Sequence, residues 1–144
     1  MPQSVQQILA QSTFYTDGTD YTLIKLPARA IIVAAGIIAE VGEPFGALIV
    51  DKNEVTLLTY SEVVDEFKSR LIDVEIQPIP YRLITIDIEL PSTLIGFIAY
   101  ISQSLADAGI SILPYAAFTR DHIVVPADKV EKALSVLETL RSGK

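Results

Sequence analysis

Two carboxylates near the middle of the chain have the spacing that acid–base or cation chemistry requires. Asp87 and Glu89 are one residue apart in a stretch of alternating residue types, and alternate side chains on a β-strand point to the same face. Paired carboxylates can bind a cation or exchange a proton with a substrate. Two acids at a strand end more often form a solvated edge, and we favour that interpretation.

A tight turn later in the chain supplies the second candidate. Asp121 follows Thr119 and Arg120 in this turn, and His122, the single histidine of the chain, begins the next strand. The Asp121 carboxylate can contact a ligand, or it can accept hydrogen bonds from the backbone of its own turn. For His122 we favour a half-exposed position on the strand over a role in binding or catalysis.

The composition limits the chemistry that these residues can perform. The 144 residues contain no cysteine, which excludes disulfides, thiolate metal ligands and cysteine nucleophiles. One histidine is too few for a histidine-rich metal site, and the sequence has no P-loop or nucleophile-elbow motif. The formal net charge of −7 leaves no basic surface to neutralise nucleic-acid phosphates. We therefore expect no metal, no cofactor and no nucleic-acid partner.

No segment of the sequence has the length of a membrane span. The longest apolar run covers residues 30–39, whereas a bilayer requires about 20 apolar residues. Residues 1–10 are polar and lack the basic start and apolar run of a secretory signal. We therefore expect a cytoplasmic protein without a membrane partner.

The second half of the chain shows the pattern of a β–α–β–β–α unit. Residues 81–89 alternate like a strand, residues 93–108 have apolar side chains at helical spacing, and residues 110–118 and 122–125 are two further strands before a final helix. Gly109 has the position of a helix stop, and Gly96 falls inside the predicted helix. The buried stripe of that helix is predicted to consist of Ile95, Ile98, Ile101, Leu105 and Ala108.

The first half contains a similar set of elements. Ser4 and Gln7 have the spacing of a capping box, which predicts a short N-terminal helix. Strands are predicted at residues 21–26 and 30–35, the second one buried on both faces because it is continuously apolar. Residues 45–50 and 54–60 indicate a hairpin, followed by a helix from Ser61. We therefore expect an α+β chain with an N-terminal helix and turn (1–20), a first unit (21–78) and a second unit (79–144).

Three runs in the second half resemble the ACT domain family. They are residues 96–101 (Gly-Phe-Ile-Ala-Tyr-Ile), residues 105–111 (Leu-Ala-Asp-Ala-Gly-Ile-Ser) and residues 118–126 (Phe-Thr-Arg-Asp-His-Ile-Val-Val-Pro). More narrowly, they resemble the ACT-7 type, which occurs as tandem units in small bacterial proteins and in cytosolic arginine sensors. Residues 26–30 and 45–58 resemble the partner unit more loosely.

The resemblance implies a fold and a mode of binding. The fold would be two tandem ferredoxin-like, ACT-type units, each an antiparallel sheet with helices packed on one face. Such proteins bind small ligands, usually amino acids, at the interface between two ACT units and catalyse no reaction. The exposed strand edges favour a homodimer, and a sensor without an output domain needs a further protein partner.

The resemblance also implies a set of ligand-binding residues. The amino-acid head of the ligand would meet the backbone around Ile110 and Ser111, Gly96 would allow its close approach, and Asp121 would face an amino or guanidinium group. The complete implied set is Gly96, Ile110, Ser111, Phe118, Thr119 and Asp121.

Three functions are compatible with these residues, and we favour the first. It is a non-catalytic sensor or regulatory protein that binds a small molecule, most simply an amino acid. The alternative is a ligand-free interaction or dimerisation module, because Ala116 and Ala117 replace two hydroxyl residues of the family pattern. The third is an enzyme on the same scaffold, and it depends only on Asp87, Glu89, Asp121 and His122.

Overall fold

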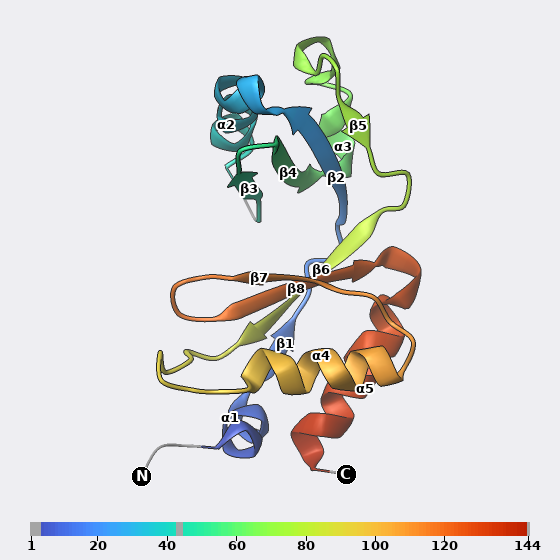
Figure 1. Ribbon diagram of the computed structural model, residues 1–144. Coiled ribbons are helices and arrows are strands. Elements are labelled where there is room, and N and C mark those ends of the chain that lie inside the picture. The colour runs from blue at the N-terminus through green and yellow to red at the C-terminus, as the bar shows by residue number, and fades with distance from the viewer. Residues whose placement is uncertain (1–3, 43–44, 144) are drawn as a thin grey trace. The chain divides into compact units, whose positions relative to one another are not determined.

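The chain folds into two compact units in the computed structural model, which describes residues 4–42 and 45–143 (Figure 1). The central unit runs from Thr19 to Tyr81. The terminal unit combines the start of the chain, up to Gly18, with the residues from Arg82 onward. The N-terminal segment therefore packs with the second half of the chain.

An antiparallel sheet forms the central unit. Its strands are β2 (Asp20–Pro27), β3 (Ala47–Val50), β4 (Glu54–Tyr60) and β5 (Glu75–Ile76), in the order β3–β4–β2–β5. The predicted hairpin at residues 45–60 is confirmed. Its turn is closed by Asp51, whose Oδ1 accepts hydrogen bonds from the backbone N–H groups of Asn53 at 2.7 Å and Glu54 at 3.0 Å.

The helices of the central unit pack on one face of this sheet. They are α2 (Ile31–Val41), the short α3 (Ser61–Val64) and the 3-10 turns η1 (Ala28–Ala30) and η2 (Lys68–Arg70). The core between the helices and the sheet consists of Ile24, Leu26, Ala34, Ile37, Val55, Leu57 and Phe67. Strand residues that alternate with this set face away from the helices.

The prediction of a buried strand at residues 30–35 is wrong, because these residues begin helix α2. Ala34 and Ile37 are buried three residues apart, which is helical spacing. The opposite side of the helix is also apolar, so the sequence shows one continuous apolar run and no amphipathic pattern. Periodicity alone does not separate a strand from a helix in such a run.

The helical conformation of α2 predicts whether a substitution at its internal glycine raises or lowers the free energy of unfolding. A Cβ atom at Gly36 meets nothing within 4 Å, so Gly36→Ala is expected to raise the free energy of unfolding by about 0.5–1 kcal/mol. The matched control is Gly109→Ala, which also has open space but a φ of +77°. It is expected to lose about 1–2 kcal/mol. Urea unfolding of both variants checks this, and a destabilising Gly36→Ala would contradict a helix at this position.

The terminal unit has a sheet of its own. Its strands are β1 (Thr13–Tyr15), β6 (Tyr81–Asp87), β7 (Leu113–Ala116) and β8 (Asp121–Pro126), in the order β1–β6–β8–β7. The N-terminal strand β1 pairs antiparallel with the end of β6, from Thr13 opposite Asp87 to Tyr15 opposite Thr85. The predicted hairpin of β7 and β8 is confirmed, with Ala116 opposite Asp121.

Three helices cover one face of this sheet: α1 (Val5–Gln11), α4 (Phe97–Asp107) and α5 (Val130–Ser142), the last preceded by the 3-10 turn η3 (Ala127–Lys129) (Figure 1). The capping box of Ser4 and Gln7 is confirmed. The core consists of Ile8, Leu9, Ile84, Ile86, Phe97, Ile101, Leu105, Ile110, Ile123, Val125, Val130, Ala133 and Leu137. Both units are thus α+β, with antiparallel strands and helices on one face, which confirms the predicted fold class.

The start of α4 differs from the prediction. The helix begins at Phe97 rather than at residue 93, and Gly96 is its N-cap in the left-handed conformation with φ +85°. Ile95 therefore lies before the helix and is 89% exposed, so its predicted place in the buried stripe is wrong. At the other end, Gly109 follows the helix with positive φ, as predicted. None of the helices in the described residues combines the length and hydrophobicity needed to cross a membrane.

Candidate functional site

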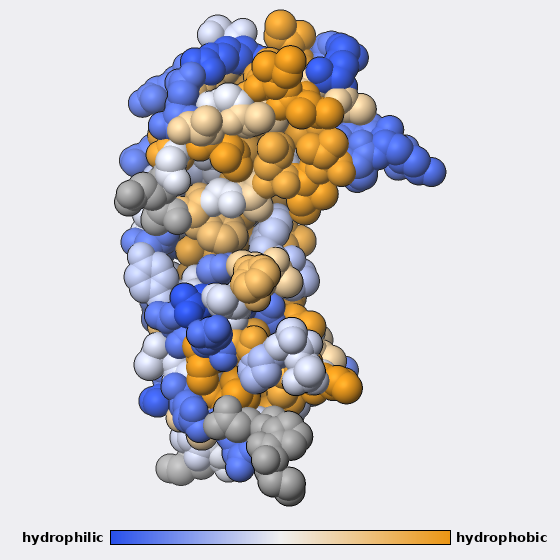
Figure 2. Space-filling model, turned by 90° about the vertical axis from the view of Figure 1, so that its left-hand side faces the viewer, coloured by the Kyte–Doolittle hydropathy of each residue, from blue (hydrophilic) through white to orange (hydrophobic). Residues whose placement is uncertain are grey.

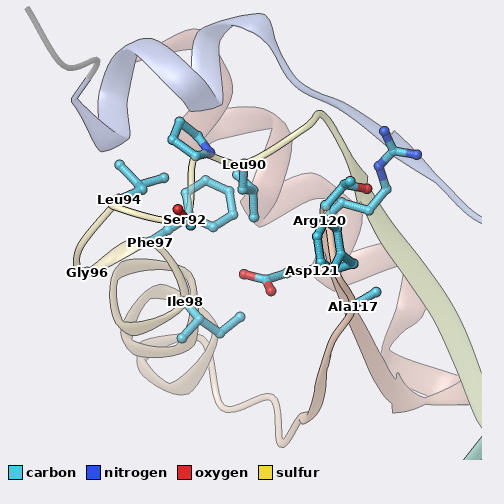
Figure 3. A pocket seen from close by; sticks show the side chains of 12 residues that line it. Leu90, Ser92, Leu94, Gly96, Phe97, Ile98, Ala117, Arg120 and Asp121 are labelled. Carbon is cyan, nitrogen blue, oxygen red and sulfur yellow. The ribbon is translucent and has the colours of Figure 1, made fainter.

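A pocket of about 240 Å³ lies in the terminal unit, between the start of α4 and the turn that joins β7 to β8 (Figure 3). Two segments far apart in the sequence form its walls. The first is the connection from β6 to α4, and the second is the β7–β8 turn. The residues that line it are Leu90, Pro91, Ser92, Leu94, Gly96, Phe97, Ile98, Ala117, Phe118, Thr119, Arg120 and Asp121.

Backbone hydrogen bonds hold the two walls in place. The N–H of Leu90 donates to the carbonyl of Thr119 at 2.6 Å, which joins the β6–α4 connection to the turn. The N–H of Ala117 donates to the carbonyl of Arg120 at 3.0 Å and closes the turn itself. Asp121 directly follows this turn and is the first residue of β8.

The amino-terminal end of α4 contributes positive potential to the pocket. The first N–H groups of any α-helix have no acceptor within the helix and form the positive end of its dipole. In α4 no side chain caps these groups, and the first turn contains no acidic residue. Gly96, Phe97 and Ile98 from this end all line the pocket, so the helix offers unsatisfied donors to an anionic group there.

The Asp121 carboxylate contributes the opposite charge. It points into the pocket, between the start of α4 and the β7–β8 turn (Figure 3). Within residues 4–42 and 45–143 no hydrogen bond or ion pair reaches this carboxylate. Burial raises the pKa of the Asp121 carboxyl above its ordinary value, while the neighbouring His122 acts in the opposite direction. A bound cationic group would supply the partner that this part of the chain does not provide.

Arg120 and His122 direct their polar atoms elsewhere. Figure 3 shows the Arg120 guanidinium pointing away from the pocket, and its Nε lies 3.7 Å from Asp87 Oδ1 on β6. His122 Nδ1 lies 2.8 Å from Thr85 Oγ1, also on β6. Arg120, in the β7–β8 turn, and His122, on β8, therefore both contact β6. Because β6 ends at Asp87, Glu89 lies beyond the strand and the predicted same-face pairing of these two carboxylates does not arise.

The structure brings four of the six predicted site residues to one pocket: Gly96, Phe118, Thr119 and Asp121. Ile110 and Ser111 are not among its lining residues. Ile110 is 4% exposed in the core, and its N–H donates to the carbonyl of Leu105 at 3.0 Å in the helix stop. Ser111 is exposed beyond it.

Sequence reasoning missed most of the wall between β6 and α4. Leu90, Ser92 and Leu94 line the pocket although they carry no motif of their own. One signal was available, because a chain that leaves a strand and enters a helix within a few residues brings those residues to the helix N-terminus. Neither the described acids nor His122 form a group of three or more that could hold a metal ion.

His122 gives the stability of the protein a pH dependence of known sign. Burial lowers the pKa of His122 below the ordinary 6.5, with Arg120 adding to this and Asp121 and Asp87 opposing it. The unfolded chain therefore binds more protons than the folded one just below pH 6.5, and the free energy of unfolding is expected to fall as the pH decreases through that window.

The variant His122→Gln is expected to lose this part of the pH dependence, as measured by urea unfolding at several pH values between about 7.5 and 5.5. The raised pKa of Asp121 acts in the opposite direction in a lower window, nearer to 3.8. Identical slopes for the wild type and the variant would contradict the assignment to His122.

The comparisons with known proteins agree with this architecture. A family model described as an ACT domain matches residues 78–139. A Vibrio cholerae protein of unknown function, described as a possible transport protein, is 23% identical over 96% of each chain with a TM-score of 0.74. The ligand-free regulatory subunit of aspartate kinase from Thermus thermophilus is 20% identical over 90% of this chain and 96% of that one, with a TM-score of 0.67.

A longer enzyme has the same fold in one part. The aspartate kinase of Clostridium acetobutylicum, an allosteric enzyme, is 14% identical over 91% of this chain but only 34% of its own, with a TM-score of 0.66. No curated protein matches the sequence at a significant level. At these identities the similarity to the solved structures shows a common fold.

Proposed function

We propose that the protein, whose residues 78–139 match the ACT domain model, is a regulatory ACT protein that binds an α-amino acid in the pocket of the terminal unit. The fold shared with regulatory subunits of aspartate kinase supports a regulatory role. The amino-acid ligand is supported by the chemistry of the pocket. The absence of catalysis, the cytoplasmic location and the ligand position between two ACT units stay predictions.

One observation carries the proposal: the Asp121 carboxylate, which no described residue reaches with a hydrogen bond or an ion pair, lines the same pocket as the uncapped end of α4. An α-amino acid has a cationic ammonium group and an anionic carboxylate separated by one carbon. The ammonium complements Asp121, and the carboxylate complements the N–H groups of α4.

The remaining walls indicate the side chain of the ligand. Leu90, Leu94 and Ile98 contribute apolar groups, and Ser92 and Thr119 add polar groups beside them. The volume of about 240 Å³ lies below the range of pockets for drug-sized ligands, which begins near 300 Å³. We therefore propose an amino acid with a small, uncharged side chain as the ligand.

A thermal-shift panel of the common amino acids tests this function on the full chain. A ligand present at 100 times its dissociation constant should stabilise the protein by about 2.7 kcal/mol, which corresponds to a shift of several degrees. Two analogues of the best ligand serve as controls. The α-keto acid lacks the ammonium group and the amino-acid amide lacks the carboxylate, so both should give a much smaller shift.

A flat panel would contradict the proposal and favour the alternative, a ligand-free interaction module with a protein partner. One observation supports that alternative. The turn at the pocket carries Ala116 and Ala117 in place of two hydroxyl residues, and Phe118 beside them is fully exposed. An exposed phenylalanine on a turn is a typical contact residue in protein interfaces.

A further inference from the structure

A cationic side chain lies directly beside the carboxylate of the pocket and does not pair with it. Arg120 precedes Asp121 in the chain, and both residues line the pocket. Figure 3 shows the Asp121 carboxylate pointing into the pocket and the Arg120 guanidinium pointing away from it. No ion pair joins these two described side chains. A guanidinium matches a carboxylate in both charge and geometry, so another contact must keep the two groups apart.

Asp87 provides that contact. The Nε atom of Arg120 lies 3.7 Å from Oδ1 of Asp87, the last residue of β6. Thr13 of β1 lies opposite Asp87 in the sheet, so pairing between strands fixes the backbone of this aspartate. The guanidinium therefore lies on the side of Asp87, and the Asp121 carboxylate is accessible from the pocket.

The pair of Arg120 and Asp87 is loosely held. The two side chains are 38% and 49% exposed, and ion pairs with this access to water contribute little to stability. Figure 2 shows hydrophilic residues at the surface on the side of the molecule where this turn lies in Figure 1. The distance of 3.7 Å is too long for a hydrogen bond, and the buried Nε atom has no hydrogen-bond partner among the described residues. A small change is therefore enough to release the guanidinium.

We propose that Arg120 competes with the ammonium group of the ligand for Asp121, and that Asp87 keeps the pocket open by holding the guanidinium away. The inference rests on the proposed function, because it concerns the same carboxylate. Rotation of the Arg120 side chain suffices for the exchange, since hydrogen bonds fix the backbone of the turn. When Arg120 pairs with Asp121, the chain itself fills the cationic half of the site. The ratio of the two arrangements then sets the apparent affinity for the ligand.

A double-variant cycle separates this role from a merely structural one. The probe is L-alanine, or the amino acid of the panel that gives the largest thermal shift, and isothermal titration measures its affinity. In Asp87→Asn the guanidinium loses its partner and pairs with Asp121, so the affinity is expected to fall by about 5- to 10-fold. Adding Arg120→Gln removes the competitor, so the double variant should return to within about twofold of the wild type. If the pair were only structural, the double variant would bind as weakly as Asp87→Asn, and that result would overturn the proposal.

Glu89→Gln is the matched control. It removes the same charge two residues after Asp87, and Glu89 is exposed, lies beyond β6 and does not line the pocket. Its affinity should equal that of the wild type. Equal losses in Glu89→Gln and Asp87→Asn would assign the effect to the general potential around the pocket and contradict a specific role of Asp87. Circular dichroism verifies that all variants remain folded.

A measurement without ligand tests the exchange itself. The carboxyl group of Asp121 is titrated by NMR in the wild type, in both single variants of an acid and in the double variant. A guanidinium close to a carboxyl group favours its charged form. The pKa of Asp121 should therefore be lower in Asp87→Asn than in the wild type and in Glu89→Gln, and the double variant should reverse this decrease.

The same titration distinguishes failure of this inference from failure of the proposed function. An unchanged pKa of Asp121 in Asp87→Asn would overturn the inference, even if the affinity for the amino acid falls. A panel in which no amino acid binds the wild type would contradict the proposed function instead. The titration needs no ligand, so its outcome would still decide whether Arg120 pairs with Asp121 once Asp87 is changed.

Discussion

The variant Asp121→Asn is expected to lose most of the stabilisation that the amino-acid ligand gives to the wild type. Hydrogen bonds to charged groups contribute about 1.5–3 kcal/mol, so the affinity should fall by about 10- to 100-fold. A ligand concentration that stabilises the wild type by about 2.7 kcal/mol would then stabilise the variant by as little as ~0.4 kcal/mol. Isothermal titration and thermal shift measure this loss directly.

The physical reason is the environment of this carboxylate. It is partly buried, its pKa is raised by burial, and no group in the described part of the chain donates to it. A ligand ammonium would interact with it in a site partly screened from water, and an asparagine amide offers no negative charge. Without the ligand, removal of the charge eliminates the burial penalty, so the free variant should be at least as stable as the wild type at neutral pH.

Asp128→Asn is the matched control, because Asp128 is an exposed aspartate of η3 and does not line the pocket. It should bind the ligand like the wild type. Equal affinities of Asp121→Asn and the wild type would show that the ligand binds elsewhere, even if the amino-acid panel gives a clear shift. The two experiments therefore separate the function from the site.

The largest loss of stability is expected for Phe97→Ala. Phe97 is 4% exposed and joins the core of the terminal unit while its ring also forms a wall of the pocket. Removing a buried aromatic ring costs about 3–5 kcal/mol through lost burial and the cavity left behind. The unfolding midpoint of the terminal unit should fall by more than about 10 °C, as measured by calorimetry.

Phe118→Ala makes the same chemical change at the opposite extreme of exposure. Phe118 is fully exposed on the β7–β8 turn, so the free energy of unfolding should change by less than about 0.5 kcal/mol. If the two variants lost similar stability, Phe118 would be covered by something other than water. That outcome would point to a contact of this turn with a partner.

Local sequence patterns predicted much of the fold correctly. The capping residue Ser4, the hairpin turn at Asp51 and the helix stop at Gly109 act through their own backbone neighbourhood, so their effects are readable without tertiary information. Patterns failed where both sides of an element are apolar. The sequence of helix α2 shows no amphipathic period, because its outer face carries Ile31 and Ile32 in place of polar residues.

Only part of the candidate site could be predicted from the sequence. Gly96, Phe118, Thr119 and Asp121 were predicted and line one pocket, whereas Leu90, Ser92 and Leu94 were not predicted. The predicted helix started too early, at residue 93, because Ile95 fits the apolar spacing. In the structure the left-handed Gly96 ends the connection and starts the helix. The spacing of apolar residues does not predict a left-handed backbone conformation.

The sequence by itself determined the α+β class, the ACT-like second half and the elements whose causes are local, because each depends on residues within a few positions of one another. Only the tertiary structure decided three further features. It adds β1 to β6 across about 70 residues, it joins Leu90 to Thr119 to form the pocket, and it places Asp121 on the same pocket as the start of α4. Each results from packing between distant segments, which local propensity does not encode.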